Sequence, residues 1–147
     1  MQLPCMDINA PRVSYAIEKL EAAQKQLRNV ERSWAEFDKD VRILEGSIQE
    51  LQHARPQTIA ANSITSVLPR VENVTKSACD VITVEVYAGI KCGLRSRSNY
   101  RKEDITAINT MCEKTAQLLN EVITYDELAF CISKYVESVK GTLKKDL

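Results

Sequence analysis

The sequence has few aromatic residues, few glycines and few prolines. Aromatic residues make up 5% of the 147 residues, and glycine and proline occur four times each. Such a composition suits a helical rod and argues against a β-sandwich, which needs many turn residues and strand-forming side chains. The formal net charge is zero, so no overall electrostatic field draws the chain to nucleic acid or to an acidic membrane.

The sequence also lacks long apolar runs. A membrane-spanning helix needs roughly 18 uncharged apolar residues, and the most apolar region is interrupted by Asp80, Glu85 and Lys91. Residues 1–7 show no basic stretch followed by an apolar one, as a secretory signal would. The cysteines number five, an odd count that fits a reducing compartment better than a disulfide framework. We therefore expect an intracellular, cytoplasmic protein.

Residues that carry chemistry are scarce. His53 is the only histidine, and we expect it to be solvated at a helix end rather than part of a catalytic group. The cysteines show no C-x-x-C spacing, which argues against a structural zinc site. A glycine-rich phosphate loop and the E-x-x-H motif of di-iron bundles are both missing. Glu36 and Asp40 are four residues apart on an outer helix face, where carboxylates are usually solvated. We expect no enzyme, no metal, no cofactor and no small-molecule substrate. The five cysteines are Cys5, Cys79, Cys92, Cys112 and Cys131.

What the sequence does contain is one long amphipathic pattern, which predicts a helix over residues 11–54. Its apolar positions repeat at steps of three and four, the pattern of a helix that packs against another helix. Pro11 suits the first turn of such a helix, and Pro56 ends it. The stripe consists of Val13, Ile17, Leu20, Leu27, Val30, Trp34, Phe37, Val41, Leu44, Ile48 and Leu51.

The stripe has one irregularity. Gln24 occupies a position where an apolar residue is expected, and the step from Leu27 to Val30 is three residues where four was due. Such a slip overwinds a coiled coil locally. We therefore expect either a change of supercoil near Asn29 or the point at which the helix changes neighbours.

Three further helices are predicted. The second covers residues 58–90, where Pro69 indicates a kink or a restart of the helix with Ser66 as its cap. The stretch from Asp80 to Tyr87 also alternates like a strand, but an isolated strand would have no partner. The third covers 103–122, and the fourth covers 125–144 after the capping-box sequence T-x-x-E that begins at Thr124. Residues 91–102 are predicted to be a loop.

These elements predict an all-α fold: one domain, residues 1–147, forming an elongated antiparallel helical bundle. The first two helices would form a long coiled-coil-like hairpin, and the two shorter ones would pack along part of it as an antiparallel pair. An end-to-end arrangement of the short helices would instead cover the whole hairpin, but their short connection disfavours it. We expect the hairpin end around residues 34–51 and 59–71 to be thinly covered.

That expectation identifies a candidate interaction seam. A pair of exposed apolar stripes is a natural place for a partner chain, and buried aromatic residues dominate binding energies. The leading hypothesis is a non-enzymatic protein–protein interaction module that assembles with itself or serves as a subunit or adaptor of a larger complex. The seam residues are Trp34, Phe37, Val41, Leu44, Ile48 and Leu51. A pair such as Trp34 and Phe37, one helical turn apart, belongs to a core more often than to an interface.

Two alternative functions depend on other segments. The predicted loop at residues 91–102, which we call the basic loop, has several cations and no acidic residue. One hypothesis is that it contacts phosphate on RNA or lipid, or an acidic partner. Phosphorylation of Ser96 or Ser98 would change its charge. A solvated loop is the simpler interpretation. A membrane-active bundle would open an apolar face such as Val81 to Ile90 onto lipid. The basic loop residues are Lys91, Arg95, Arg97, Arg101 and Lys102.

Overall fold

The computed structural model describes residues 10–53, 58–59, 61–92 and 100–144, and all of its elements are helices. They are α2 (Ala10–His53), α3 (Ala61–Cys92), α4 (Lys102–Leu119) and α5 (Tyr125–Leu143). The prediction of an all-α elongated bundle with a long N-terminal helix and two shorter C-terminal helices is confirmed. Within the described residues only an isolated bridge, Thr58 to Thr124, has β geometry, so the strand alternative for residues 80–87 is wrong.

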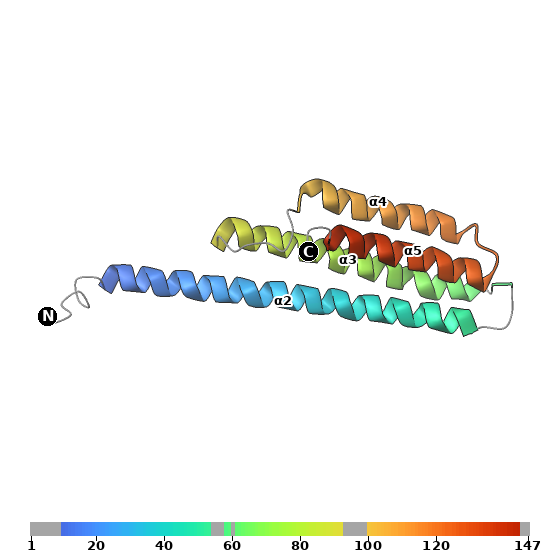
Figure 1. The fold of residues 1–147 in the computed structure, drawn as a ribbon, viewed down its shortest axis with the longest axis horizontal. Helices are drawn as coiled ribbons and strands as arrows, with labels where there is room; N and C mark the ends of the chain where they lie inside the picture. The colour runs from blue at the N-terminus through green and yellow to red at the C-terminus, as the bar shows by residue number, and fades with distance from the viewer. Residues whose placement is uncertain (1–9, 54–57, 60, 93–99, 145–147) are drawn as a thin grey trace.

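The helices form two layers around one core. α2 and α3 run antiparallel as a hairpin, and α5 lies in the groove between them, as Figure 1 shows. α4 packs on α3 and α5 from the outside, and it makes no contact with α2 in the described part of the chain. The core therefore lies among α2, α3 and α5, and α4 closes its outer side.

The helix boundaries differ from the predicted ones by up to three residues; α3, for example, runs from Ala61 to Cys92 where residues 58–90 were predicted. α4 ends at Leu119, three residues earlier than predicted, because Asn120 takes the C-cap position. α3 runs without a break through Pro69, so a restart of the helix with Ser66 as cap is wrong. Pro69 is exposed, which gives its ring room in solvent although its missing N–H removes one helical hydrogen bond.

The start of α5 is the best-explained local feature. The Thr124 hydroxyl accepts a hydrogen bond from the Glu127 amide at 3.2 Å, and the Glu127 carboxylate accepts from the amides of Ile123 and Thr124. This is the predicted capping box, which satisfies amides that the first helical turn leaves unpaired. Two acidic residues in the first turn, Asp126 and Glu127, also favour the positive end of the helix dipole.

The position of the short pair along the hairpin is set at the α4–α5 turn. The Ile59 amide donates to the Ile123 carbonyl at 3.0 Å, beside the Thr58–Thr124 bridge. These contacts tie the α4–α5 turn to the α2–α3 connection, so both short helices lie at the closed end of the hairpin. The predicted antiparallel packing of the short pair along part of the hairpin is confirmed, but the end left uncovered is the opposite of the one expected.

Candidate interaction surfaces

The predicted seam is part of the core. All six of its residues are buried within their own chain: Trp34, Phe37, Val41, Leu44, Ile48 and Leu51. Trp34 and Phe37 meet edge to face, with ring centroids 6.0 Å apart. The expectation that this end of the hairpin is thinly covered is therefore wrong, because α5 is anchored against it. These residues stabilise the fold and offer no surface to a partner.

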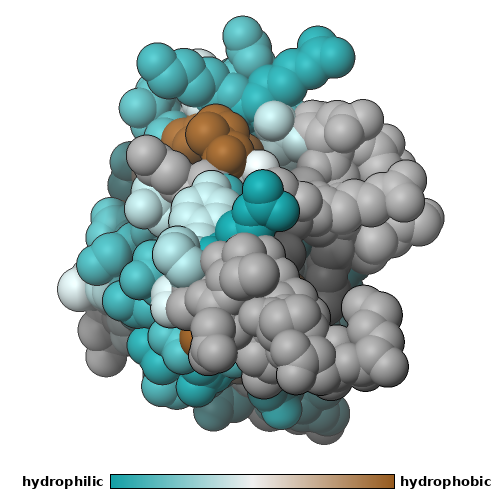
Figure 2. Space-filling model, turned by 90° about the vertical axis from the view of Figure 1, so that its left-hand side faces the viewer, coloured by the Kyte–Doolittle hydropathy of each residue, from teal (hydrophilic) through white to brown (hydrophobic). Residues whose placement is uncertain are grey.

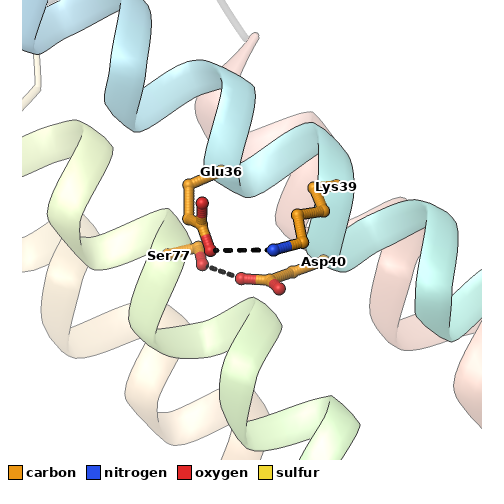
Figure 3. Close-up of polar contacts among 4 residues, drawn as sticks. All are labelled: Glu36, Lys39, Asp40 and Ser77. Atoms are coloured by element: carbon orange, nitrogen blue, oxygen red, sulfur yellow. Dashed lines mark hydrogen bonds and ion pairs between the residues drawn. The ribbon is translucent and has the colours of Figure 1, made fainter.

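The polar edge of the α2–α3 interface shows how this packing is held in register. The Ser77 hydroxyl on α3 donates to the Asp40 carboxylate on α2, while Glu36 pairs with Lys39 at 3.9 Å on the same helix (Figure 3). Two helical turns further along α2, the Ser47 hydroxyl accepts a hydrogen bond from the Arg70 guanidinium on α3. Asp40 thus contacts α3 and is half-buried rather than solvated as predicted, whereas Glu36 is exposed, as predicted.

The uncovered surface is the first part of α2. We call residues 11–28 the α2 arm; every residue in it is exposed except the half-buried Ala23 and Gln26. In Figure 1 the first turns of the arm project beyond the nearest ends of α3, α4 and α5. Its apolar stripe is therefore open to solvent, with exposed fractions of 46% for Val13, 48% for Ile17, 64% for Leu20 and 47% for Leu27.

The slip in the heptad pattern coincides with the end of the arm. From Trp34 onward the stripe is buried, Val30 is half-buried, and before Val30 it is exposed. The helix thus changes neighbours close to Asn29, as one of the two expectations from the sequence had it. Leu20, Leu27 and Trp34 stay seven residues apart, so the slip moves only every second position of the stripe and turns its centre by about 50° around the helix. The arm's apolar stripe is therefore turned by about half a residue relative to the stripe that packs on α3 and α5.

A second apolar surface lies between α4 and α5, on the side away from α3. It is a groove of about 540 Å³. Three of its large side chains are half or more exposed: Leu118 at 50%, Ile123 at 64% and Phe130 at 65%. The Lys134 ammonium lies over the Phe130 ring, 5.6 Å from its centroid. The main apolar residues that line the groove are Met111, Leu118, Val122, Ile123, Phe130 and Cys131.

Sequence analysis missed this groove. Its most exposed apolar residues, Leu118, Ile123 and Phe130, do not fall on the three-and-four spacing of the third and fourth helices. The offset of Phe130 from the stripe that begins at Leu128 was the available signal. An aromatic residue one position away from a helix's buried stripe lies at the edge of the covered face.

A smaller apolar hollow lies where α3 ends and α4 begins. Its volume is about 280 Å³, and it includes Tyr87 and Ile90, which are 49% and 77% exposed.

Figure 2 shows the molecule from the end where α2 begins. The described atoms there are mostly hydrophilic, with a brown area near the top, on the side of α4. The proposed membrane-active face begins nearby, but Val81 and Ile82 are buried.

The basic loop lies mostly outside the described residues. Arg95 and Arg97, with Ser96 and Ser98, fall in the segment 93–99 that the structure does not describe, and the side chain of Lys91 is likewise outside the description. Arg101 and Lys102 are exposed at the start of α4, where the Arg101 amide donates to the Asp104 carboxylate at 2.7 Å. Contact of this loop with phosphate stays a prediction.

Burial raises the pKa values of two cysteine thiols and of one tyrosine hydroxyl. Desolvation raises the pKa of Cys79, with Asp80 and Cys112 adding to the effect, and desolvation also raises the pKa of Cys131. Burial likewise raises the pKa of Tyr135, whose hydroxyl contacts Thr75. Raised pKa values keep both thiols protonated near neutral pH, which makes them poor nucleophiles.

The described ranges hold no group of three or more histidine, cysteine or acidic side chains placed to bind a metal. No helix in them has the length and apolar character needed to cross a membrane. His53, the single histidine, is exposed at the last residue of α2.

Comparison of the chain with family models, with curated proteins and with solved structures gives no match.

Proposed function

We propose that this protein is a helical interaction module whose binding surface is the α2 arm, and that it works as a subunit of a larger assembly. The observation that carries the proposal is the exposed heptad stripe of Val13, Ile17, Leu20 and Leu27. A surface helix of a globular protein normally turns such a stripe toward its own core. Here the part of the stripe from Leu20 back to Val13 lies past the level at which α3 ends, at Cys92.

The energetics favour a partner over permanent exposure. Burying a Leu or Ile side chain contributes roughly 1.5–3 kcal/mol, so four such residues hold a substantial association energy. The arm extends a helix whose later turns are fixed in the core, which removes the cost of helix nucleation. A preformed helix with a heptad stripe loses little conformational freedom on docking, and pre-organisation of this kind increases affinity.

Affinity capture from the native source tests the proposal with three baits: the unmodified chain, the double variant Ile17→Glu/Leu20→Glu, and the control Ala22→Glu. Ala22 is exposed on the opposite face of the arm, so the control adds a charge to the same helix without touching the stripe. We expect the unmodified chain and the control to retain the same partners and the double variant to lose them. Capture of the same partners by the double variant would overturn the proposal.

A thermal melt followed by circular dichroism accompanies the capture. Because Ile17 and Leu20 are exposed and lie outside the core, the double variant should melt within a few degrees of the unmodified chain. A surface substitution away from the core usually changes the free energy of unfolding by less than about 0.5 kcal/mol. Loss of partners with an unchanged melting temperature would then reflect the binding surface and not unfolding.

A further inference from the structure

The groove between α4 and α5 has an ordered pattern of charge along its length. Thr75 on α3 contacts Tyr135 on α5, and Cys79, one turn further along α3, contacts Asn109 on α4. That register sets three pairs of groove residues level with each other, one from the α4 side and one from α5. The pairs are Lys114 with Lys134, Leu118 with Phe130, and Glu121 with Glu127.

The groove is thus basic at one end, apolar in the middle and acidic at the end near the α4–α5 turn. Lys114 and Glu121 are seven residues apart, as are Glu127 and Lys134, which corresponds to about 10 Å along a helix. All four side chains are exposed. A helix that fits this groove needs an apolar stripe flanked by an acidic and a basic residue about 10 Å apart, in the opposite order.

The α2 arm has these features. Glu21 and Arg28 are also seven residues apart, both are exposed, and both flank the stripe on the same side. Each of them directly follows an apolar position of the stripe, Leu20 and Leu27. Ala23, on the other flank, is small enough to leave room beside a protruding ring such as that of Phe130.

We propose that the partner of the arm is a second copy of this chain, and that the arm of one copy lies in the α4–α5 groove of the next. Glu21 then faces the Lys114–Lys134 end, and Arg28 faces the Glu121–Glu127 end. This inference rests on the proposed function of the arm and names its partner. The apolar contacts supply the affinity, and the charge pairs select the register and direction of the helix.

Two other partnerships fit less well. The arm cannot reach the groove of its own chain, because α2 is one continuous helix and does not contact α4 within the described residues. Two arms paired in parallel would set Glu21 and Arg28 against Ala16 and Ala23, with no ion pair. Such pairing would also leave the groove, with its three exposed large apolar residues, uncovered.

The proposed contact between copies of the chain is directional. The charge order makes the docked arm parallel to α4 of the receiving copy, and α2 and α4 are parallel within each copy (Figure 1). Successive copies then point in the same direction, and the two contacting surfaces are different. A contact of this type is heterologous, and it produces an open chain of molecules, or a ring if the rotation closes.

A charge-reversal series tests the pairing in the full chain by sedimentation at several concentrations. We expect Glu21→Lys, and separately the pair Lys114→Glu/Lys134→Glu, to weaken self-association about tenfold, because like charges then face each other. The triple variant that combines them should recover the association of the unmodified chain. The matched control Glu18→Lys changes the same charge on the outer side of the arm and should have little effect.

Cross-linking places the arm directly. In the proposed register, position 24 lies level with Cys131 of the receiving copy. A benzophenone-maleimide attached to the Gln24→Cys variant needs no thiolate on the receiving copy, and on illumination it should cross-link to the groove residues around Cys131, as identified by peptide mass mapping. The same label on Ala22→Cys, on the opposite face, should not reach them. Cross-links that join two arms to each other, without Cys131, would overturn the inference.

The remaining outcomes separate this inference from the proposed function. If the chain stays monomeric at every concentration, or if the groove variants leave self-association unchanged, the second copy's groove is not the partner and the inference fails. The capture experiment decides the proposed function independently, because it asks whether the stripe binds any partner at all.

Discussion

Trp34 and Leu20 belong to the same apolar stripe of one helix, yet their environments differ completely. Trp34 is 5% exposed and packs edge to face on Phe37, whereas Leu20 is 64% exposed. Removing each side chain should therefore affect different processes. The contrast separates residues that stabilise the fold from those that we propose to bind a partner.

Trp34→Ala should lower the free energy of unfolding by about 3–5 kcal/mol, because it leaves a cavity where a large side chain was enclosed. Leu20→Ala should change it by less than about 0.5 kcal/mol. Urea unfolding at a protein concentration low enough to prevent association measures both. Equal effects of the two substitutions would contradict the burial pattern described here.

Burial of Tyr135 makes stability depend on alkaline pH. Burial raises its pKa in the folded chain above the ordinary value of 10.0, so above about pH 10 the unfolded chain loses this proton first and the folded chain keeps it. Between the two pKa values the unfolded state binds fewer protons, and the free energy of unfolding falls as pH rises. Below the unfolded pKa the contribution is fully present.

We therefore expect the melting temperature to fall above about pH 10 and Tyr135→Phe to reduce that dependence. The control is Tyr87→Phe, at an exposed tyrosine. The pKa values of Cys79 and Cys131 are also raised, and they act in the same direction above the ordinary thiol value of 9.0, so some dependence remains in the variant. Equal pH profiles for Tyr135→Phe and the unmodified chain would contradict this assignment.

At the scale of helices, periodicity predicted most of the fold. Steps of three and four residues located all four helices, and T-x-x-E located the start of α5 at Tyr125. The α4 end was placed three residues late because Val122 continues the apolar period although it lies in the turn. Hydrophobic spacing cannot distinguish a last helical turn from a turn residue that packs against the same core.

The sequence could not predict which part of α2 is covered. The stripe before Val30 and the stripe after it have the same spacing, so each indicates only that one helix face is apolar. What decides coverage is the contact of Ile59 and Thr58 with the α4–α5 turn. Those residues belong to connections without a periodic pattern, and their pairing joins positions more than 60 residues apart.

Hydrogen exchange should divide α2 into two parts. Amides of the arm, which lacks tertiary packing, should exchange much faster than those of residues 37–51, since local opening costs least where few apolar contacts are lost. At concentrations where the chain associates, the arm amides should become protected. Slow exchange of the arm in the monomer would show that something within the chain already covers it.

At the scale of the whole molecule, the structure is asymmetric along its length. A packed bundle occupies one end and the uncovered arm the other, and the groove lies on the outer side of the bundle. The arm and the groove are different surfaces, and the order of charges along one is complementary to the order along the other. This asymmetry is why we favour directional assembly over a closed dimer.

The most direct test of this account is the mass of the full chain in solution as a function of concentration, compared with that of Leu20→Glu. We predict that the mass of the unmodified chain rises above the 16.6 kDa of one chain as concentration increases, without stopping at two copies, and that Leu20→Glu stays at one chain. A constant mass of 16.6 kDa for both proteins, with both folded, would contradict it.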